Sequence, residues 1–506
     1  MNPIAFARLL SADEDARLLQ AALDLLAEPG MRIGSAGLLH ALGRAGASAD
    51  DATGIVRFPA PLVRQTLEQA RGEEAARRDA CGADTLRAAG ALTFSWHTPF
   101  MTSSPPFQAS LGGGCPLYYD HAGSQVRYAS ETDLVRMLHL AEGLPEIVTC
   151  GNPVHCVLDA DGRRNPPELM PILGAAAIAR NSSKPGASAL MSPWQLDYLV
   201  AIGEVVRGGR DAYHRHPVFI NVNDTVPPLE LSRPEGEIIE ALAARGLPVY
   251  ILPMPLMGVA APVTVLASAA VAIAEILGVW TAAKALNPEV PLECSVVAGA
   301  LEPRTGNPCF SAPEAAAIDL AVAQFFRNRG LRCGTGVGFI DAPVPGVAAV
   351  YERTQKAVLA ALAGESSYPV GILAAGNVFS PEQLMLDLDI GAGHHHFLDS
   401  FDGGDLDEAV ALVRQRGIGG MFLDTDHTAE HFRRRLWVPR VFVREKTKDP
   451  RDAPDPVRIA HERWTALVAQ TPPYVLPDDK AREIDRIVDR ARKAVTAGSG
   501  STARMS

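Results

Sequence analysis

An isolated carboxylate lies in a long apolar segment of the sequence. Glu275 is the one ionisable side chain among residues 261–280, which read APVTVLASAAVAIAEILGVW. A charged group in apolar surroundings needs a partner or a proton. We therefore predict that Glu275 either forms a buried ion pair with an Arg or Lys of a neighbouring helix or contacts a substrate, and it is a candidate catalytic residue.

Polar side chains follow two apolar runs that are typical of buried strands. Asn152 and His155 lie in GNPVH, and Asn221, Asn223 and Asp224 lie in INVND. In parallel sheets the carboxyl ends of the strands meet at one edge, where ligands bind. We therefore predict that these five residues bind substrate.

A run of histidines at 394–396 indicates another possible chemistry. If the run is a strand, His394 and His396 point to the same side, and such a pair with a third ligand could hold a metal. His427 and His431 are four apart on a predicted helix. Because no ligand set is complete at a recognisable spacing, we predict no metal and assign His394 and His396 to substrate contact. A metal-dependent hydrolase or lyase that uses these histidines stays the alternative.

The elements that carry these residues alternate between strands and helices. Seven short apolar runs begin between Glu146 and Pro369, with helical patterns between them. Strands that are apolar on both faces and separated by helices indicate a parallel sheet. An eighth strand could come from HHHFLDSF at His394 or from FLD near Phe422. We therefore predict an α/β fold, a (β/α)8 barrel of the TIM type with helical extensions at both ends.

Helix-start signals favour the same architecture. Four runs are followed by a serine with Glu or Gln three residues later: Ser192 with Gln195, Ser232 with Glu235, Ser311 with Glu314, and Ser380 with Gln383. This is the spacing of a capping box, and each has a proline in the first turn. We expect these helix N-termini to surround the end of the sheet that carries the chemistry.

The barrel is predicted to occupy the middle of the chain. Residues 1–130 form a helical and partly stranded N-terminal extension packed on the barrel, and residues 131–440 form the barrel. Residues 441–497 form C-terminal helices, and residues 498–506 form a disordered tail.

The composition restricts the possible partners. The 506 residues have a formal net charge of −11, which argues against a nucleic acid or an anionic membrane as the main partner. Seven dispersed cysteines without a C-x-x-C pair indicate reduced thiols in a cytoplasm. The first residues do not resemble a signal peptide, and a buried strand and helix explain residues 251–283 better than a membrane span. We expect small-molecule or protein partners and a homo-oligomer.

Several segments resemble one family. Residues 254–280, MPLMGVAAPVTVLASAAVAIAEILGVW, resemble the signature segment of the trimethylamine methyltransferase family. Residues 30–70, 127–147, 379–391 and 422–442 resemble other landmarks of that family. Together these segments extend over most of the chain.

The resemblance implies a (β/α)8 barrel that moves a methyl group from a methylated amine to the cobalt of a separate corrinoid protein. We therefore expect a corrinoid protein as partner and no tightly bound cofactor in this chain. Members named for trimethylamine contain pyrrolysine at a position that falls here at Ser366 or Ser367. Without pyrrolysine, the better substrate is a quaternary, betaine-like amine, because it leaves as a neutral tertiary amine.

The resemblance also bears on the catalytic candidates. Glu275 falls in the family's signature segment. Glu352 stays at the end of IDAPVPGVAAVYE, where Gly346 and Ala348 replace two polar residues of the family. We assign Glu275 and Glu352 as catalytic candidates, with a buried ion pair as the alternative for each. The two replacements also leave open a catalytically silent betaine-binding protein.

Aromatic residues are further candidates for substrate binding. An aromatic face holds a quaternary ammonium ion with about 0.5 to 2 kcal/mol. Trp96 and His97 in FSWHTPF, and Tyr368 before the seventh apolar run, are the candidates.

Overall fold

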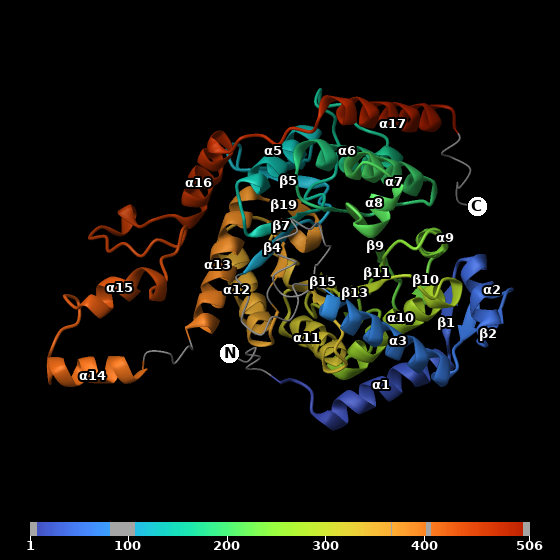
Figure 1. Cartoon of the computed structure of the whole chain (residues 1–506), viewed down its shortest axis with the longest axis horizontal. Coiled ribbons are helices and arrows are strands. Elements are labelled where there is room, and N and C mark those ends of the chain that lie inside the picture. The colour runs from blue at the N-terminus through green and yellow to red at the C-terminus, as the bar shows by residue number, and fades with distance from the viewer. Residues whose placement is uncertain (1–7, 81–106, 366, 401–405, 499–506) are drawn as a thin grey trace.

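A curved parallel sheet in two parts lies at the centre of the molecule (Figure 1). The computed structural model describes residues 8–80, 107–365, 367–400 and 406–498. One part pairs five parallel strands in chain order: β8 (Gly186–Ser188), β9 (Phe219–Asp224), β11 (Val249–Leu252), β13 (Leu292–Val296) and β16 (Gly334–Thr335). The other places β4 (Gln108–Leu111) between β7 (Ile147–Cys150) and β17 (Ser367–Val370), again in parallel. The predicted α/β class with a parallel sheet is confirmed.

Helices follow the strands in the order that the sequence predicts. They are α5 (Glu131–Glu142), α6 (Met170–Asn181), α7 (Trp194–Arg207), α9 (Arg233–Ala244), α10 (Val265–Leu286), α11 (Pro313–Asn328), α12 (Val347–Leu362) and α13 (Pro381–Asp399). Each of the seven apolar runs overlaps one of the parallel strands. The alternation of buried runs and helical patterns was therefore a sound guide to these elements.

Both candidates for an eighth strand are wrong. Residues 394–399 lie in α13, and residues 422–424 form no strand. The eighth parallel strand is β4, from the predicted N-terminal extension, which pairs with β7 and β17. A short apolar run does not distinguish a strand from the end of a buried helix, and the histidine run continues a helix that is buried over most of its length.

Two of the four predicted serine caps are present. Ser232 and Ser380 each accept a hydrogen bond from the backbone N–H three residues later, at the starts of α9 and α13. Ser192 and Ser311 do not cap: in α7 and α11 the following residue is the N-cap, without a side-chain hydrogen bond. The helices start close to where predicted, but capping chemistry differs among them.

The segment around Glu275 forms α10, a core helix. Within the described part of the chain it is the one helix long and apolar enough to cross a membrane, and 83% of its most apolar window is buried. It packs against α1 (Ala12–Ala27), α2 (Ala36–Arg44), α3 (Ala60–Ala80) and α11. A helix covered on all sides is apolar on all sides, which explains its composition.

Extensions pack around the parallel sheets. The small sheet β10–β1–β3–β2 joins β1 (Met31–Ile33), β3 (Ile55–Arg57) and β2 (Ser48–Asp50) to β10 (Glu230–Leu231), which follows β9. At the other terminus α16 (Pro456–Gln470) packs on α13, and α17 (Asp478–Thr496) packs on α6 and α7. Helices α14 (Leu406–Arg416) and α15 (Asp426–Arg435) project from the body (Figure 1) and are referred to below as the arm.

Candidate active site

The parallel sheets enclose a cavity of about 280 Å³. Its lining comes from all eight parallel strands or from residues next to them. Three lining residues are exposed, Gly113, Ala189 and Asp224, and each lies at or just after the carboxyl end of a strand. The cavity therefore opens at the carboxyl ends, the edge of the sheet where ligands bind in folds of this type.

Four buried polar atoms of the lining residues have no hydrogen-bond partner in the described part of the chain. They are Asn152 Oδ1, His155 Nδ1, Ser188 Oγ and Thr335 Oγ1. Most buried polar atoms in native proteins are paired, so each exception needs an explanation. Four exceptions around one cavity indicate a site that a polar ligand completes.

Close packing by glycine places the two polar residues that follow β7. A Cβ atom on Gly174 of α6 would lie 2.3 Å from Asn152 Nδ2, so only glycine lets this helix approach the side chain so closely. Gly114 has a φ of +59° and packs against the His155 ring, where a Cβ atom would lie 3.1 Å away. Burial lowers the pKa of His155, which favours the neutral imidazole. Asn152 and His155 thus present neutral polar groups.

Two carboxylates line the cavity. Glu365 is paired with Arg327 at 2.8 Å. Asp224 has no ion-pair partner among the described residues, and burial raises its pKa to about 6. Asp224 lines the cavity and is exposed at its opening, so the carboxylate is open to a ligand.

A third carboxylate lies beside Asp224. Glu235 of α9 is close enough to Asp224 for the charge of Asp224 to raise the pKa of Glu235. Burial, and then the charge of Asp224, raise the pKa of Glu235 to about 8. Two carboxyl groups at such close range cannot both ionise without cost, so this end of the cavity favours a positive charge.

Aromatic rings form another part of the wall. Tyr250, Phe339 and Tyr368 line the cavity. The Tyr250 hydroxyl donates to Ser295 Oγ at 2.6 Å, and the Tyr368 hydroxyl donates to the Asp387 carbonyl oxygen at 3.1 Å. Because both hydroxyls are engaged with protein groups, the rings are held in place as surfaces that attract a cation.

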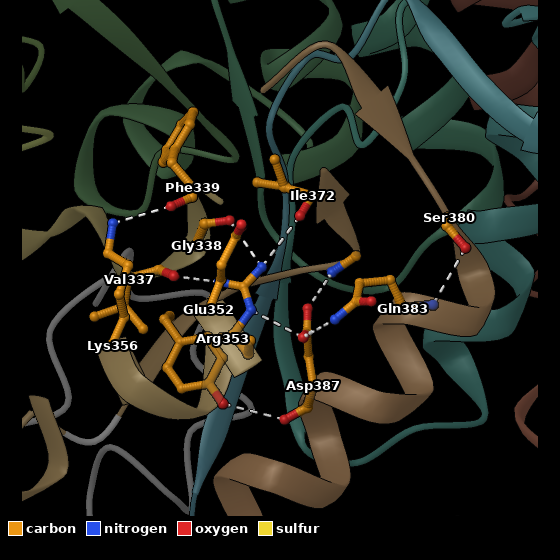
Figure 2. A network of polar contacts seen from close by, with 12 residues as sticks. Val337, Gly338, Phe339, Glu352, Arg353, Lys356, Ile372, Ser380, Gln383 and Asp387 are labelled. Carbon is orange, nitrogen blue, oxygen red and sulfur yellow. Dashed lines mark hydrogen bonds and ion pairs between the residues drawn. The ribbon is translucent and has the colours of Figure 1, made fainter. Parts of the chain in front are cut away.

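A buried ion pair fixes the wall that carries Tyr368 (Figure 2). Arg353 of α12 is fully buried and donates to Asp387 Oδ1 of α13 at 2.8 Å. Other N–H groups of its guanidinium donate to carbonyl oxygens of the segment after β16 and of Ile372. Asp387 Oδ2 also accepts from the Gly371 N–H at 2.8 Å. The network therefore joins α12 and α13 to the segment after β16 and to the segment after β17.

The sequence profile of the trimethylamine methyltransferase (MTTB) family matches residues 105–496. The chain belongs to this family. A trimethylamine methyltransferase MttB of Methanosarcina barkeri (strain Fusaro / DSM 804) is 24% identical over 497 residues, 96% of this chain and 95% of the relative. A glycine betaine methyltransferase of Desulfitobacterium hafniense (strain Y51) is 23% identical over 386 residues, 76% of this chain and 79% of the relative. Among solved structures, the monomethylamine methyltransferase MtmB of Methanosarcina barkeri matches with a TM-score of 0.47 and 12% identity, over 97% of this chain and 88% of the other.

One of the two residues expected to match the pyrrolysine position lines the cavity. Ser367, one of the two matched residues, begins β17 and lines the cavity. Ser366 lies outside the described residues.

The residues predicted in INVND divide between two faces of β9. Val222 and Asp224 line the cavity, whereas Asn221 and Asn223 do not. Asn221 Oδ1 accepts from the Leu190 N–H at 2.8 Å, and Asn223 Nδ2 donates to the Tyr250 carbonyl oxygen at 2.9 Å. The strand continues to Asp224, so its side chains alternate between faces. Asn221 and Asn223 therefore tie neighbouring strand ends together.

The buried ion pair, one of the two predictions for Glu275, is not present among the described residues. Glu275 is fully buried and accepts hydrogen bonds from Thr225 Oγ1 at 2.5 Å and from the Leu229 N–H at 2.7 Å. Burial raises its pKa to about 7. Two neutral donors and a raised pKa replace the charged partner that the apolar helix seemed to require. Glu275 does not line the cavity; it holds the loop that follows Asp224.

Glu352 has a comparable position behind another loop. It does not line the cavity, and its Oε2 accepts from the backbone N–H groups of Asp341 and Ala342, each at 2.9 Å. These residues follow β16, at the same edge of the sheet as the cavity opening. The expected ion pair is again replaced by backbone donors.

The histidine run forms neither the substrate contact predicted for His394 and His396 nor the metal pair of the alternative. In a helix, residues two apart point in different directions, and His394 and His396 lie in α13. Burial lowers the pKa of His394, while His396 Nε2 lies 3.1 Å from the Arg435 carbonyl oxygen. Neither residue lines the cavity. In α15 the rings of His427 and His431 lie 4.6 Å apart.

A different set of ligand-type side chains meets where α13 begins. His121, Glu382 and His461 bring three such atoms within 4.8 Å of one another. Glu382 Oε1 already accepts from His461 Nδ1 and from Trp464 Nε1, both at 2.8 Å. The His121 and His461 rings stack at 4.2 Å and 24°, so their in-plane lone pairs run side by side instead of converging. The hydrogen bonds of this cluster therefore attach α16 to α13.

Some site residues lie outside the structure or outside the predictions. Trp96 and His97 fall within residues 81–106, which the structure does not describe. Ser188, Thr335 and Tyr250 line the cavity without having been predicted. Their available signal was a single polar group near the end of an apolar run, such as the serine in GASALMS.

Proposed function

We propose that this chain transfers a methyl group from a quaternary amine to the Co(I) of a corrinoid protein. One observation carries the proposal: a cavity, open at the carboxyl ends of the strands, in which an unpaired carboxylate, three aromatic rings and four unpaired neutral polar atoms meet. Membership of the trimethylamine methyltransferase family supports methylated-amine chemistry.

The reaction needs little proton transfer. The bond between nitrogen and one methyl carbon breaks, and its electron pair stays on nitrogen, so a quaternary ammonium leaves as a neutral tertiary amine. The new carbon–cobalt bond takes both its electrons from Co(I). The chain must therefore bind the cation, direct one methyl group to the opening and keep water away from the reacting atoms.

The lining residues divide these tasks. Asp224 and the rings of Tyr250 and Tyr368 hold the positively charged nitrogen, since carboxylates and aromatic faces both attract cations. Asn152 and His155 orient the rest of the substrate through the polar atoms that have no protein partner. Trp96 and His97 remain candidates for the same cavity.

We propose that Glu275 and Glu352 act on the substrate indirectly, through the loops that they hold. Each carboxyl group holds a loop at the open edge of the sheet, Glu275 after β9 and Glu352 after β16. We propose that both are positioning residues, because neither lines the cavity.

Exposed apolar side chains extend around the opening. They lie in the segments that follow five successive strands: Met191 after β8, Val226 after β9, Val259 and Val263 after β11, Leu301 after β13, and Val344, Val347 and Tyr351 after β16. We refer to them as the rim arc. An apolar patch of this extent marks an interaction surface. We propose that the corrinoid protein docks here, because its cobalt must reach the methyl group through the opening.

We also propose that the two parallel sheets close into one eight-stranded barrel. At one seam the Cys150 N–H donates to the Pro185 carbonyl oxygen at 2.6 Å, which joins β7 to the residue before β8. At the other seam Gly338 lies against Pro369 of β17, where a Cβ atom would be 2.2 Å from Pro369 Cγ. Backbone contact at both seams supports closure.

Two further features support proposals about the cellular compartment and the oligomeric state of the protein. All six cysteines in the described ranges are free thiols, which supports a reducing cytoplasm. The segment that joins the two helices of the arm exposes apolar side chains, among them Ile418, Met421 and Leu423. We propose that the arm packs against a second copy of this chain in a homo-oligomer.

The test is turnover. The protein is incubated with reduced cobalamin and a panel of quaternary amines, and methylcobalamin is followed by its absorbance. Asn152→Ala is expected to lower kcat/KM by about tenfold or more, because one hydrogen bond to a buried polar group is lost. Asn377→Ala, at an exposed residue that does not line the cavity, is the matched control. The proposal is overturned if no quaternary amine methylates cobalamin, either free or bound to a corrinoid protein.

A further inference from the structure

The charges that line the cavity are unequally balanced. Asp224 and Glu365 are the two acidic residues of the described lining, which contains no Lys or Arg. Glu365 is neutralised by Arg327 at 2.8 Å. Arg353, behind the wall, is paired with Asp387 at 2.8 Å. The negative charge of Asp224 is therefore the one charge of the described lining that no protein group offsets.

The neighbours of Asp224 do not reduce this imbalance. Glu235 adds a second carboxyl group beside it. His155 also lines the cavity, and burial lowers its pKa, which favours its neutral form. The other polar lining groups, Ser188 and Thr335 among them, are neutral hydroxyls. A ligand that supplies one net positive charge would complete the electrostatic balance, and a ligand without net charge would not.

We propose that Asp224 makes the cavity selective for quaternary amines with a net positive charge over zwitterionic betaines. This inference rests on the proposed function. The names of the relatives do not choose between these classes, because one is a trimethylamine methyltransferase and another a glycine betaine methyltransferase. The choice is made by the residues around the cavity.

The physical reason is repulsion between two carboxylates that share one small cavity. A betaine places a negative charge a few bonds from its ammonium, and in a cavity of about 280 Å³ that charge stays near Asp224. Like charges at short range repel strongly. An alcohol in the same position both donates and accepts, so it suits the unpaired polar atoms of Asn152, His155, Ser188 and Thr335.

Choline and glycine betaine are a matched pair of probes. Both carry a trimethylammonium group on a short chain, which ends in an alcohol in choline and in a carboxylate in glycine betaine. We expect the wild-type protein to show a kcat/KM for choline at least about tenfold above that for glycine betaine, the effect of one uncompensated charge. Asp224→Asn should lower the value for choline, raise or preserve that for glycine betaine, and so remove the preference.

Two controls isolate the role of Asp224. Asp161→Asn removes an exposed carboxylate from the loop after β7, away from the cavity, and should leave the preference unchanged. Thermal unfolding and circular dichroism show whether Asp224→Asn is folded. Calorimetric binding of choline and glycine betaine to the wild-type protein gives the same comparison without turnover and without a variant.

The outcomes separate the two proposals. Methylation of cobalamin by glycine betaine in preference to choline supports the methyltransferase function and overturns the selectivity. An unchanged preference in folded Asp224→Asn overturns the role of Asp224. If neither amine methylates cobalamin, the proposed methyltransferase function fails. In that case, tighter calorimetric binding of choline than of glycine betaine still supports the selectivity. Equal or reversed affinities overturn it.

Discussion

Replacing Glu275 by Gln tests how a lone carboxyl group is accommodated in a core helix. The carboxyl group accepts hydrogen bonds from Thr225 and Leu229 and faces no cation among its hydrogen-bond partners. In the Gln variant the amide oxygen accepts from the Leu229 N–H, and the amide nitrogen donates to the Thr225 hydroxyl oxygen. The variant therefore mimics the protonated form of Glu275 and keeps both contacts.

The magnitude follows from the pKa. Burial raises the pKa of Glu275 from 4.5 to about 7 in the folded protein. Between these values the folded state binds more protons than the unfolded state, so the free energy of unfolding decreases as the pH rises. The whole change corresponds to about 3 kcal/mol. Glu275→Gln should thus match the wild-type protein near pH 4.5 and exceed its stability by up to about 3 kcal/mol above pH 7.

The assay is urea unfolding at several pH values from 5 to 8, because the difference between variant and wild type cancels the groups that titrate in both. Glu314→Gln, which changes an exposed carboxylate on α11, is the control and should show no such trend. A stability difference that stays constant across this pH range would refute the raised pKa. A Gln variant that is less stable at every pH would show that the loop needs the ionised carboxylate.

Three further changes test the network, the rim arc and the arm. Arg353→Met should lower the free energy of unfolding by about 3 to 5 kcal/mol, because it leaves the Asp387 charge buried and unpaired. The double variant with Asp387→Leu should recover most of this loss in urea unfolding. A double variant that stays as unstable as Arg353→Met would contradict the ion-pair argument. Val347→Asp, at a side chain that is 90% exposed, should lower kcat/KM for a corrinoid protein by about tenfold or more while turnover with free cobalamin persists. Equal losses with Val475→Asp, an exposed valine between α16 and α17, would argue against docking at the rim arc. Leu423→Glu on the arm should reduce the molar mass measured by light scattering, and an unchanged mass would exclude the arm as the contact between copies.

The fold was predictable where the signal is local. The runs that became β7 through β17 are short, apolar and separated by helical patterns, and this order fixes a parallel arrangement. β4 was missed because QASL is short and only partly apolar. Its identity as a strand comes from partners on both sides, β7 and β17, which are distant in sequence. Pairing of this kind is a tertiary effect that local propensity does not contain.

The sequence predicted which edge of the sheet carries the candidate site, but not which side chains at that edge face the cavity. Asn152, His155 and Asp224 were expected at strand ends and line the cavity, and Tyr368 does so as well. Asn223 is an asparagine at a strand end, as Asn152 is, and it directly precedes Asp224. It nevertheless points to the other face of β9. Which face of a strand turns inward depends on the curvature and pairing of the whole sheet, and the sequence of one strand does not state it.

The position of Asp224 depends on parts of the chain that never touch the cavity. The loop after Asp224 is held from one side by Glu275 of α10. From the other side, β10 of the same loop pairs with β1 of the N-terminal extension, where the Arg32 N–H donates to the Leu229 carbonyl oxygen at 2.9 Å. Leu229 is thus held through its N–H by the core helix and through its carbonyl group by the extension. A carboxylate that is open to a ligand and unpaired needs such external support, because no contact of its own side chain fixes it. The core helix α10 and the N-terminal sheet therefore both hold the short loop that follows Asp224.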